Sequence, residues 1–430
     1  MKKLRVLLLG GGGREHALAW KINQSEWLEQ LYVAPGNSGT AQVATNLAFS
    51  DGDFGAMKNA LIENEVDLVV VGPEAPLVKG LREFIESDKE IDHVRIVGPG
   101  AKGARLEGSK SFSKQFMKRH SIPTASFGEF GKDQLSAAFD FLESMNAPFV
   151  LKADGLAAGK GVLILDDRER AKVELDLMLR KGKFGTAGEK VVIEEFLNGI
   201  ELSVFVLTDG KDYVILPEAK DYKRIGEGDS GLNTGGMGSI SPVHFAKGDF
   251  MQKVEEKIIK PTIKGLQQED IPYNGFIFIG LMNVGGEPFV IEYNCRLGDP
   301  ETESIIPRIE SDLLKAFWLC VNNKAVDIDL RVTDQTAACL MAVSGGYPEA
   351  YEKEKVISGL DSIKDSLVFH AGTASKNGEI VTSGGRVIAI TSLAPNLKQA
   401  LDLSYKSMKQ MTFEKINYRK DIGFDLIQSD

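Results

Sequence analysis

Short apolar runs that end in glycine or proline alternate with helical patterns over the first hundred residues. Helical spacing of apolar residues lies between these runs, as in His16 to Ile22 and Phe54 to Asn64. The runs predicted as strands are LRVLLLGGGG from Leu4, LYVAPGNSG from Leu31, VDLVVVGPEAPL from Val66 and VRIVGPG from Val94. Strands that alternate with helices indicate a doubly wound parallel sheet, whose ligands bind beyond the carboxyl ends of its strands.

The first glycine turn, Gly10 to Gly13, lies at such a strand end. Its match to GxGxxG is poor, because the last glycine position falls on Glu15 or on His16. A glycine turn before a helix can still hold a phosphate or carboxylate. A structural turn and a nicotinamide site stay open as alternatives, but we favour a phosphorylated substrate. Its predicted contacts are Gly12, Gly13, Arg14, Glu15, Asn37 and Glu74.

Lysines and glycines mark the next part of the chain. The stretch GSKSFSKQFMKRH predicts a helix with Ser109 as N-cap and Lys110 in its first turn, where a lysine opposes the helix dipole unless it reaches an anion. A strand then leads to Lys152 and a glycine hairpin that could fold over phosphates, although it is not a Walker A loop. A solvated lysine and a mobile hairpin are the alternatives. The hairpin residues concerned are Gly155, Gly159, Lys160 and Gly161.

A further strand, beginning at Val191, ends in an acidic and apolar segment. Its exposed backbone and apolar pair could bind adenine, and Glu201 after the next turn could accept hydrogen bonds from ribose. The alternative is an ordinary hairpin with acidic decoration. The residues predicted to line adenine are Glu194, Glu195, Phe196 and Leu197.

The segment from Asp221 to Pro242 is rich in glycine, and we expect an ordered loop that contacts substrate phosphates. A loop of this length is usually functional or disordered, and disorder stays open as the alternative. Its candidate contacts are Lys223, Arg224 and Gly236.

The stretch FVIEYNCRLGDPET, from Phe289, reads as a buried strand that runs into a polar loop. Glu292 and Asn294 are two residues apart, so on a strand they point to the same face. A carboxylate and an amide oxygen form an oxygen-only ligand set that suits Mg²⁺ together with phosphate and water. The alternative is a strand end with a solvated acidic loop.

Composition narrows the function classes. The chain has 430 residues and a formal net charge of −10, without a basic tract, which argues against nucleic acid or an anionic membrane as the main partner. Its three cysteines show no CxxC spacing, and free thiols suit a reducing cytosol. The apolar run near the N-terminus is too short for a signal sequence, and no stretch approaches a membrane span. We therefore expect a cytoplasmic protein.

Residues 333–430 contain further apolar runs followed by a helical pattern, Leu397 to Met411, and predict a small α+β domain with antiparallel strands. The runs are Ala337 to Val343, Leu367 to His370 and Arg386 to Ile390.

Six stretches occur in an order that resembles the phosphoribosylamine–glycine ligase family of ATP-grasp enzymes: GGGREHALAW, VGPEAPLVKG, LEGSKSFSK, KADGLAAGKGV, NTGGMGSISP and IEYNCRLGDPET. The resemblance runs from Val6 to the KDIGFDL run. It implies a multidomain α/β and α+β chain: a substrate domain at 1–105, an ATP-grasp domain pair at 106–330 with a lid at about 123–193, and a C-terminal domain at 331–430. The departures are Gly11 where relatives have Asn or Ser, Tyr222 where His is common and Leu232 where Pro is common.

The resemblance also implies a reaction, in which ATP phosphorylates glycine and 5-phosphoribosylamine attacks the glycyl phosphate to give glycinamide ribonucleotide, ADP and phosphate. Glu292 and Asn294 would hold Mg²⁺ or Mn²⁺, while Lys110 and Lys152 would neutralise phosphates. Arg296 and Asp299 would bind the carboxylate and ammonium of glycine. We expect Lys152, Arg296 and Asp299 to be catalytic. The glycine turns, with Lys223 and Arg224, would receive phosphoribosylamine.

Three rival functions stay open at this point: an ATP-grasp ligase for another acid or amine, a nicotinamide oxidoreductase and a non-catalytic nucleotide-binding protein. The broken glycine fingerprint disfavours the oxidoreductase. Intact Lys110, Lys152, Glu292 and Asn294 argue against a non-catalytic protein. We expect a monomer, with a weak homodimer as the alternative.

Overall fold

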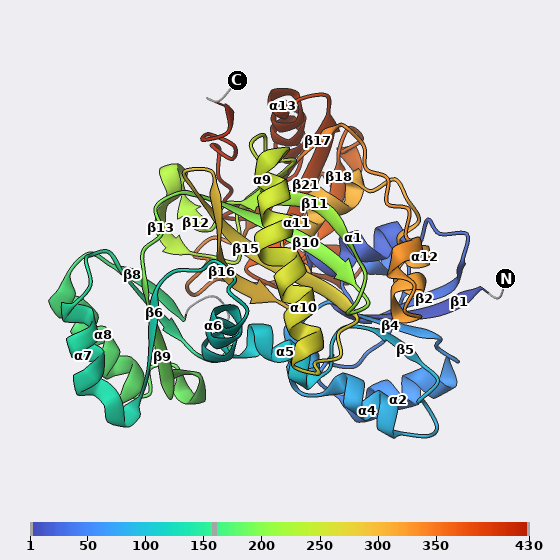
Figure 1. The fold of residues 1–430 in the computed structure, drawn as a ribbon. Coiled ribbons are helices and arrows are strands. Elements are labelled where there is room, and N and C mark those ends of the chain that lie inside the picture. Colours follow the sequence, from blue (N-terminus) through green and yellow to red (C-terminus); the bar gives the residue numbers. More distant parts are fainter. Residues whose placement is uncertain (1–2, 157–160, 428–430) are drawn as a thin grey trace.

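The computed structural model describes residues 3–156 and 161–427, and Figure 1 shows its arrangement. The N-terminal part is a five-stranded parallel sheet in the order β3-β2-β1-β4-β5, which confirms the doubly wound prediction. A short strand, β3, is the one that the apolar pattern did not indicate. The strands are β1 (Leu4–Gly10), β2 (Leu28–Pro35), β3 (Thr45–Asn46), β4 (Leu68–Val71) and β5 (Arg95–Val97).

Strand β1 lies in the middle of this sheet, between β2 and β4. It is buried on both faces, which explains its nearly unbroken apolar sequence. Its carboxyl end therefore places the Gly10–Gly13 turn at the centre of the sheet edge. The helices of this part are α1 (Gly13–Ile22), α2 (Phe54–Glu63), α3 (Glu74–Val78), α4 (Leu81–Ser87) and α5 (Ala101–Gly108).

A larger antiparallel sheet forms the middle of the molecule, in the order β16-β15-β10-β11-β14-β17-β21-β18. The predicted C-terminal strands are confirmed, but they continue this sheet instead of forming one of their own, because β17 pairs with β14. The strands are β10 (Ile200–Thr208), β11 (Tyr213–Asp221), β14 (Gly238–Ser241), β15 (Gly275–Val284), β16 (Glu287–Asn294), β17 (Thr336–Val343), β18 (Leu367–His370) and β21 (Arg386–Ala394).

The elements around this sheet are mostly helical. Helix α13 packs on β17 and β21, and the short ladder of β19 and β20 lies in the same C-terminal part. These elements are α6 (Lys110–Arg119), α9 (Asp249–Val254), α10 (Lys260–Gln268), α11 (Glu301–Ile305), α12 (Leu313–Val321), α13 (Leu397–Met408), β19 (Thr373–Lys376) and β20 (Glu379–Thr382).

The part of the chain predicted as a lid, which we call the lid, projects to the left in Figure 1 and has an apolar core of its own. It is a four-stranded antiparallel sheet in the order β6-β9-β7-β8, with α7 and α8 packed on it. The predicted glycine hairpin connects β7 to β8. The bounds are β6 (Phe127–Gly131), α7 (Leu135–Glu143), β7 (Phe149–Ala153), β8 (Val162–Leu165), α8 (Arg168–Leu179) and β9 (Lys190–Glu195).

The prediction of a loop from Asp221 to Pro242 was wrong in part. The segment contains a short hairpin, β12 (Arg224–Gly226) and β13 (Ser230–Asn233), followed by β14 of the large sheet. Its small residues hide the strand signal, and β14 forms because it pairs with β17, about a hundred residues later in the chain.

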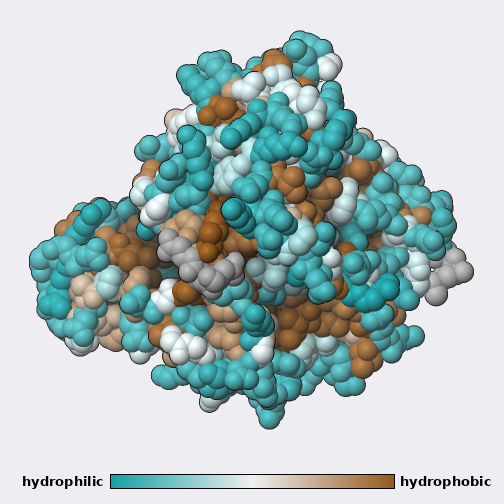
Figure 2. Space-filling model, turned by 90° about the horizontal axis from the view of Figure 1, so that it is seen from above, coloured by the Kyte–Doolittle hydropathy of each residue, from teal (hydrophilic) through white to brown (hydrophobic). Residues whose placement is uncertain are grey.

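Figure 2 shows hydrophilic residues over most of the face seen from above, with apolar residues visible at the lid and where it meets the rest of the molecule. Over residues 3–156 and 161–427, no helix combines the length and apolar character needed to cross a membrane.

Candidate active site

The carboxyl end of β16 carries Glu292 into a group of lysines. Burial opposes ionisation of this carboxyl, but the charges of Lys223, Lys110 and Lys152 hold its pKa below the ordinary value for glutamate. These three lysines come from the connection between β11 and β12, from the start of α6 and from β7 of the lid, which are far apart in the sequence. Glu292 is therefore ionised, as a carboxylate must be to bind a metal.

Glu292 and Asn294 fit a divalent metal that is bound mainly by its nucleotide. Both lie on β16, and Asn294 is buried. The described part of the chain has no group of three or more His, Cys, Asp or Glu side chains suited to a metal. Two protein oxygens would leave most coordination positions to phosphate and water, which is the usual arrangement for Mg²⁺.

A buried carboxylate, Glu194 at the end of β9, bridges two lysines. Its Oε1 lies 3.0 Å from Lys152 Nζ and its Oε2 lies 2.8 Å from Lys114 Nζ. Burial, opposed by the Glu194 charge, lowers the pKa of Lys114 to about 8. Sequence reasoning missed Lys114, although it follows Lys110 by four residues and so shares one face of α6. We call Lys110, Lys114, Lys152 and Lys223, with Glu194 and Glu292, the lysine cluster.

The start of α6 is joined to the lid hairpin by Asp154. Ser109 is confirmed as the N-cap, since its side chain accepts from Phe112 N at 3.1 Å. Asp154 accepts from Ser111 N at 2.7 Å, and its carbonyl accepts from Lys110 N at 3.0 Å. Lys110 is thus placed directly beside the hairpin, and Asp154 is a tether that the sequence patterns did not indicate.

The predicted hairpin residues are only partly covered by the structure. A Cβ on Gly155 would lie 2.9 Å from the backbone of Ala187, so the close approach explains that glycine. Gly161 accepts a backbone hydrogen bond from Ala153 at 2.8 Å. Gly159 and Lys160 lie outside the described residues.

The segment after β9 crosses from the lid sheet to the large sheet, so it is not the ordinary hairpin considered above. Phe196 is exposed in it, and Glu195 Oε1 accepts from Ser126 N at 3.0 Å. Leu197 is half-buried beside it. Glu201, on the strand that follows, forms an ion pair with Lys223. Adenine was predicted to bind along this segment, and that contact stays a prediction.

The Gly10–Gly13 turn is held by two buried side chains. Glu15 Oε2 accepts from Gly12 N at 2.6 Å. Asn37 Nδ2 donates to Gly11 O at 3.0 Å and to His370 O at 2.7 Å. Glu15 and Asn37 thus support the turn, and direct contact of either with substrate stays a prediction.

The N-terminal turn meets the loop after β16. Arg14 Nη1 donates to Leu297 O at 3.1 Å. Arg296 Nε lies 3.3 Å from Glu74 Oε2, and its Nη2 lies 2.7 Å from Glu107 Oε1. Glu107 was missed, because nothing in its local sequence indicates that α5 turns it toward Arg296. Residues from three separate stretches therefore share one site.

Asp299 is held from the C-terminal part by Arg386, which sequence reasoning also missed. Arg386 Nη2 lies 2.8 Å from Asp299 Oδ1, and Nη1 donates to Asp299 O at 2.7 Å and to Gly235 O at 2.5 Å. A Cβ on Gly236 would lie 2.3 Å from Pro300 Cδ, so close packing accounts for this glycine. We call Arg14, Arg296 and Arg386, with Glu74, Glu107 and Asp299, the arginine cluster.

The structure separates the two predicted phosphate contacts at residues 223 and 224. Burial opposes the charge of Lys223, but Asp221, Glu201 and Glu292 raise its pKa well above the ordinary value. It therefore belongs to the lysine cluster. Arg224 Nη1 instead donates to Gly231 O at 2.8 Å within the β12–β13 hairpin.

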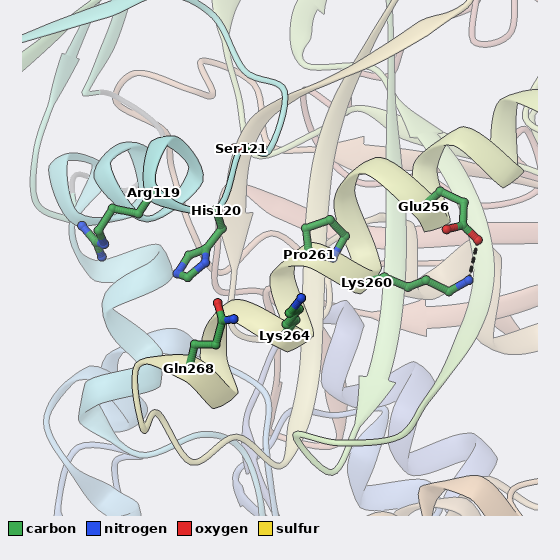
Figure 3. A pocket seen from close by; sticks show the side chains of 8 residues that line it. All are labelled: Arg119, His120, Ser121, Glu256, Lys260, Pro261, Lys264 and Gln268. Carbon is green, nitrogen blue, oxygen red and sulfur yellow. Dashed lines mark hydrogen bonds and ion pairs between the residues drawn. The ribbon is translucent and has the colours of Figure 1, made fainter.

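A cavity of about 380 Å³ between the end of α6 and α10 contains none of the predicted site residues (Figure 3). Two of its charged side chains are paired locally, as Arg119 Nε lies 2.8 Å from Glu269 Oε1 and Lys260 Nζ lies 2.5 Å from Glu256 Oε1. We assign it no function. Its lining residues are Arg119, His120, Ser121, Glu256, Lys260, Pro261, Lys264 and Gln268.

Comparison with known proteins gives matches over nearly the whole chain. Residues 4–107, 108–302 and 337–425 match the N domain, the ATP-grasp (A) domain and the C domain of phosphoribosylglycinamide synthetase. The phosphoribosylamine–glycine ligase of Caldanaerobacter subterraneus subsp. tengcongensis is 43% identical over 420 residues, covering 98% of this chain and 99% of that protein.

Two further relatives also match over nearly the whole chain. The trifunctional purine biosynthetic protein adenosine-3 of Gallus gallus is 43% identical over 429 residues, which are 98% of this chain and 42% of that protein. The crystal structure of a phosphoribosylamine–glycine ligase from Thermotoga maritima is 34% identical, with a TM-score of 0.83 over 97% of this chain and 100% of that chain.

Proposed function

The chain belongs to the phosphoribosylglycinamide synthetase family, and from this premise we propose that it joins glycine to 5-phosphoribosylamine at the expense of ATP. The products are glycinamide ribonucleotide, ADP and phosphate. A carboxylate does not condense with an amine in water, because it is unreactive and hydroxide is a poor leaving group. Phosphorylation of glycine to glycyl phosphate removes that obstacle, and the amine then displaces phosphate.

The observation that carries this proposal is the contact between two halves of the site. Arg14 Nη1 donates to Leu297 O, so the glycine turn of the parallel sheet lies against the loop that carries Arg296 and Asp299. That loop continues directly from Glu292 on β16. A sugar phosphate on the turn and a nucleotide at the strand end would thus lie at the two ends of one short segment. Glycyl phosphate formed beside the nucleotide would then lie within reach of the attacking amine.

The lysine cluster supplies the charge for phosphoryl transfer. Lys110 and Lys152 would neutralise the phosphates, and the β7–β8 hairpin would close over them. Glu194 to Leu197 would line adenine, and Glu201 would accept from ribose. Glu292 and Asn294 would hold Mg²⁺ or Mn²⁺, which offsets charge on the transferring phosphoryl group when bound. Little covalent chemistry is asked of the protein beyond positioning and electrostatics.

The arginine cluster would orient the two smaller substrates. The Arg296 guanidinium already pairs with the carboxylate of Glu74, so its position suits a carboxylate ligand. We assign the carboxylate of glycine to this arginine. Asp299 would receive the ammonium. Gly12 and Gly13 would receive the phosphoribosyl group at the start of α1, where the helix dipole favours an anion. Closure of the lid would keep water from glycyl phosphate.

We propose domains at 1–105, 106–330 and 331–430, with the lid at about 123–193. The family matches divide the chain near the same places. The independent core of the lid supports its movement as a unit. The monomeric state and the choice between Mg²⁺ and Mn²⁺ stay predictions.

The test is an assay of ADP release with purified protein, ATP and Mg²⁺, in which glycine and freshly generated phosphoribosylamine are each supplied or withheld. We expect ADP release to require both, with one glycinamide ribonucleotide formed per ADP. ADP release with another acid or amine, and none with this pair, would indicate a ligase of different substrate. A fluorescence change on titration with NADH would favour the oxidoreductase instead.

A further inference from the structure

Glu303, in α11, is a buried carboxyl that lacks a hydrogen-bond donor among the described residues. Its side chain has no exposed surface, and neither Oε1 nor Oε2 has a hydrogen-bond partner there. A Cβ on Gly13 would lie 2.2 Å from Glu303 Oε1, so the carboxyl forms part of the wall behind the glycine turn. An ionised carboxylate without a donor is costly in such a place.

The nearest ionisable neighbour of Glu303 is another carboxyl, Asp299. The two carboxyls lie close enough to interact, with no hydrogen-bond donor recorded between them, and Asp299 Oδ2 would lie 3.2 Å from a Cβ on Gly12. The two carboxyls therefore line consecutive residues of the turn. Arg386 on β21 forms its ion pair with Asp299, not with Glu303.

Other groups that face Glu303 do not supply a donor. Burial and the Asp299 charge raise the pKa of Glu303 well above its ordinary value, and Arg386 opposes them. On β17, the thiol of Cys339 faces Glu303, and its pKa is raised as well. Burial, together with the charge of Asp221 on β11, raises the pKa of the neighbouring Glu301 to about 7.

We propose that Glu303 is a positioning residue that remains the neutral acid and donates its O–H to Asp299, so that Asp299 keeps its charge and orientation toward a substrate amino group. This inference rests on the proposed function only in placing that amino group at Asp299. Two carboxyls in contact cannot both ionise cheaply, so one shared proton is the stable arrangement. Arg386 then balances the single charge that remains.

Matched substitutions separate a donor from a space-filling side chain. Glu303→Gln keeps the shape and a donor, so kcat and the KM for glycine should stay within about twofold of the parent. Glu303→Leu keeps the bulk without a donor, so the KM for glycine should rise about tenfold while the KM for ATP stays unchanged. Glu310→Gln, at an exposed site just beyond α11, is the control.

The pH dependence of stability gives a readout that a merely structural role would not move. The unfolded chain loses the Glu303 proton near pH 4.5, whereas the folded chain retains it, so the contribution of Glu303 to the stability of the parent falls as pH rises above that value. Glu303→Gln cannot ionise. Its thermal midpoint relative to the parent should therefore increase from about pH 5 to about pH 8.

An infrared difference spectrum supplies the direct observation. The parent minus Glu303→Gln spectrum at neutral pH should show the carbonyl stretch of one protonated carboxylic acid. Absence of that band, or a Gln variant that becomes less stable than the parent as pH rises, would overturn the inference. So would a Gln variant as impaired toward glycine as the Leu variant. If the parent released no ADP with glycine and phosphoribosylamine, the proposed function would fail, but both physical readouts would still test the proton.

Discussion

The lysine cluster and the arginine cluster lie at opposite ends of one short segment, residues 292–299, yet they hold charge differently. In the lysine cluster, Lys110 forms no ion pair among the described residues, Lys114 and Lys152 share a single carboxylate, and Lys223 pairs with Glu201. In the arginine cluster, Arg14, Arg296 and Arg386 each pair with a carboxylate. At one end the charge of Lys110 has no ion-pair partner among the described residues, whereas at the other end each arginine is already paired within the protein.

This difference matches the two kinds of ligand. An ammonium on a flexible stem can follow a polyphosphate that enters and leaves, and spare positive charge is then satisfied by the nucleotide. A guanidinium fixed by carboxylates is a rigid frame for small zwitterionic or amine substrates. The lysine cluster also includes a strand of the lid, while the arginine cluster is built entirely from the rest of the molecule.

Substitution of Lys152 tests the lysine cluster and should have the largest effect. Lys152→Met should lower kcat about 10³-fold, because a buried positive charge at the transferring phosphoryl group is lost. The KM for glycine should change less than about twofold, since the arginine cluster is untouched. Steady-state kinetics with ATP and glycine varied in turn give both values.

The control is Lys172→Met, which removes a lid lysine that forms ion pairs away from the site. Its kinetics should match those of the parent. If Lys152→Met raised the KM for glycine by as large a factor as it lowered kcat, the two clusters would act as one unit.

Substitution of Arg296 tests the arginine cluster. Arg296→Ala should raise the KM for glycine about 100-fold, because a charge-assisted carboxylate contact is lost, while ATP binding changes little. Isothermal titration with ATP and initial rates at varied glycine provide the measurements. Arg331→Ala, an exposed arginine with one weak ion pair at 3.9 Å, serves as the control. An unchanged KM for glycine would remove Arg296 from this role.

As pH falls, the part of the molecule around the arginine cluster should lose stability at a higher pH than the part around the lysine cluster. His16 on α1 accepts from His370 N at 2.8 Å through Nδ1, which joins the N-terminal turn to β18. Burial, and then the His370 charge, lowers the pKa of His16 to about 3, and burial lowers that of His370 to about 4. The unfolded chain takes up both protons below about pH 6.5, so stability present above that pH is lost as pH falls.

These two histidines contribute a loss of about 2 kcal/mol between pH 7 and about pH 5.5, opposite in sign to the contribution of Glu303, and His16→Asn should remove roughly half of the histidine contribution. Urea unfolding of the parent and of His16→Asn at both pH values gives that half as a difference, with His93→Asn at an exposed position as control. Hydrogen exchange should increase in α1 and β18 and stay constant in β7 and β9. An equal increase in hydrogen exchange in α1, β18, β7 and β9 would contradict a local effect.

Much of the site could be predicted because the signals are local. Ser109 as N-cap, the β7–β8 hairpin and the Glu292–Asn294 strand each depend on a few neighbouring residues whose spacing fixes one face or one turn. Lys114 was missed although its spacing from Lys110 is such a signal, whereas Glu107 and Arg386 have none. Glu107 reaches Arg296 across 189 positions, and Arg386 reaches Asp299 across 87.

The sequence by itself determined the order of strands and helices, the glycine turns and the family, because backbone propensity, apolar period and motif spacing are properties of short stretches. Only the tertiary structure decided which cations face which carboxylates, that β14 forms within a glycine-rich segment, and that Glu303 lies against Asp299 without a donor. These features depend on burial and on contacts between distant residues, which change the cost of a charge far more than any neighbour along the chain does.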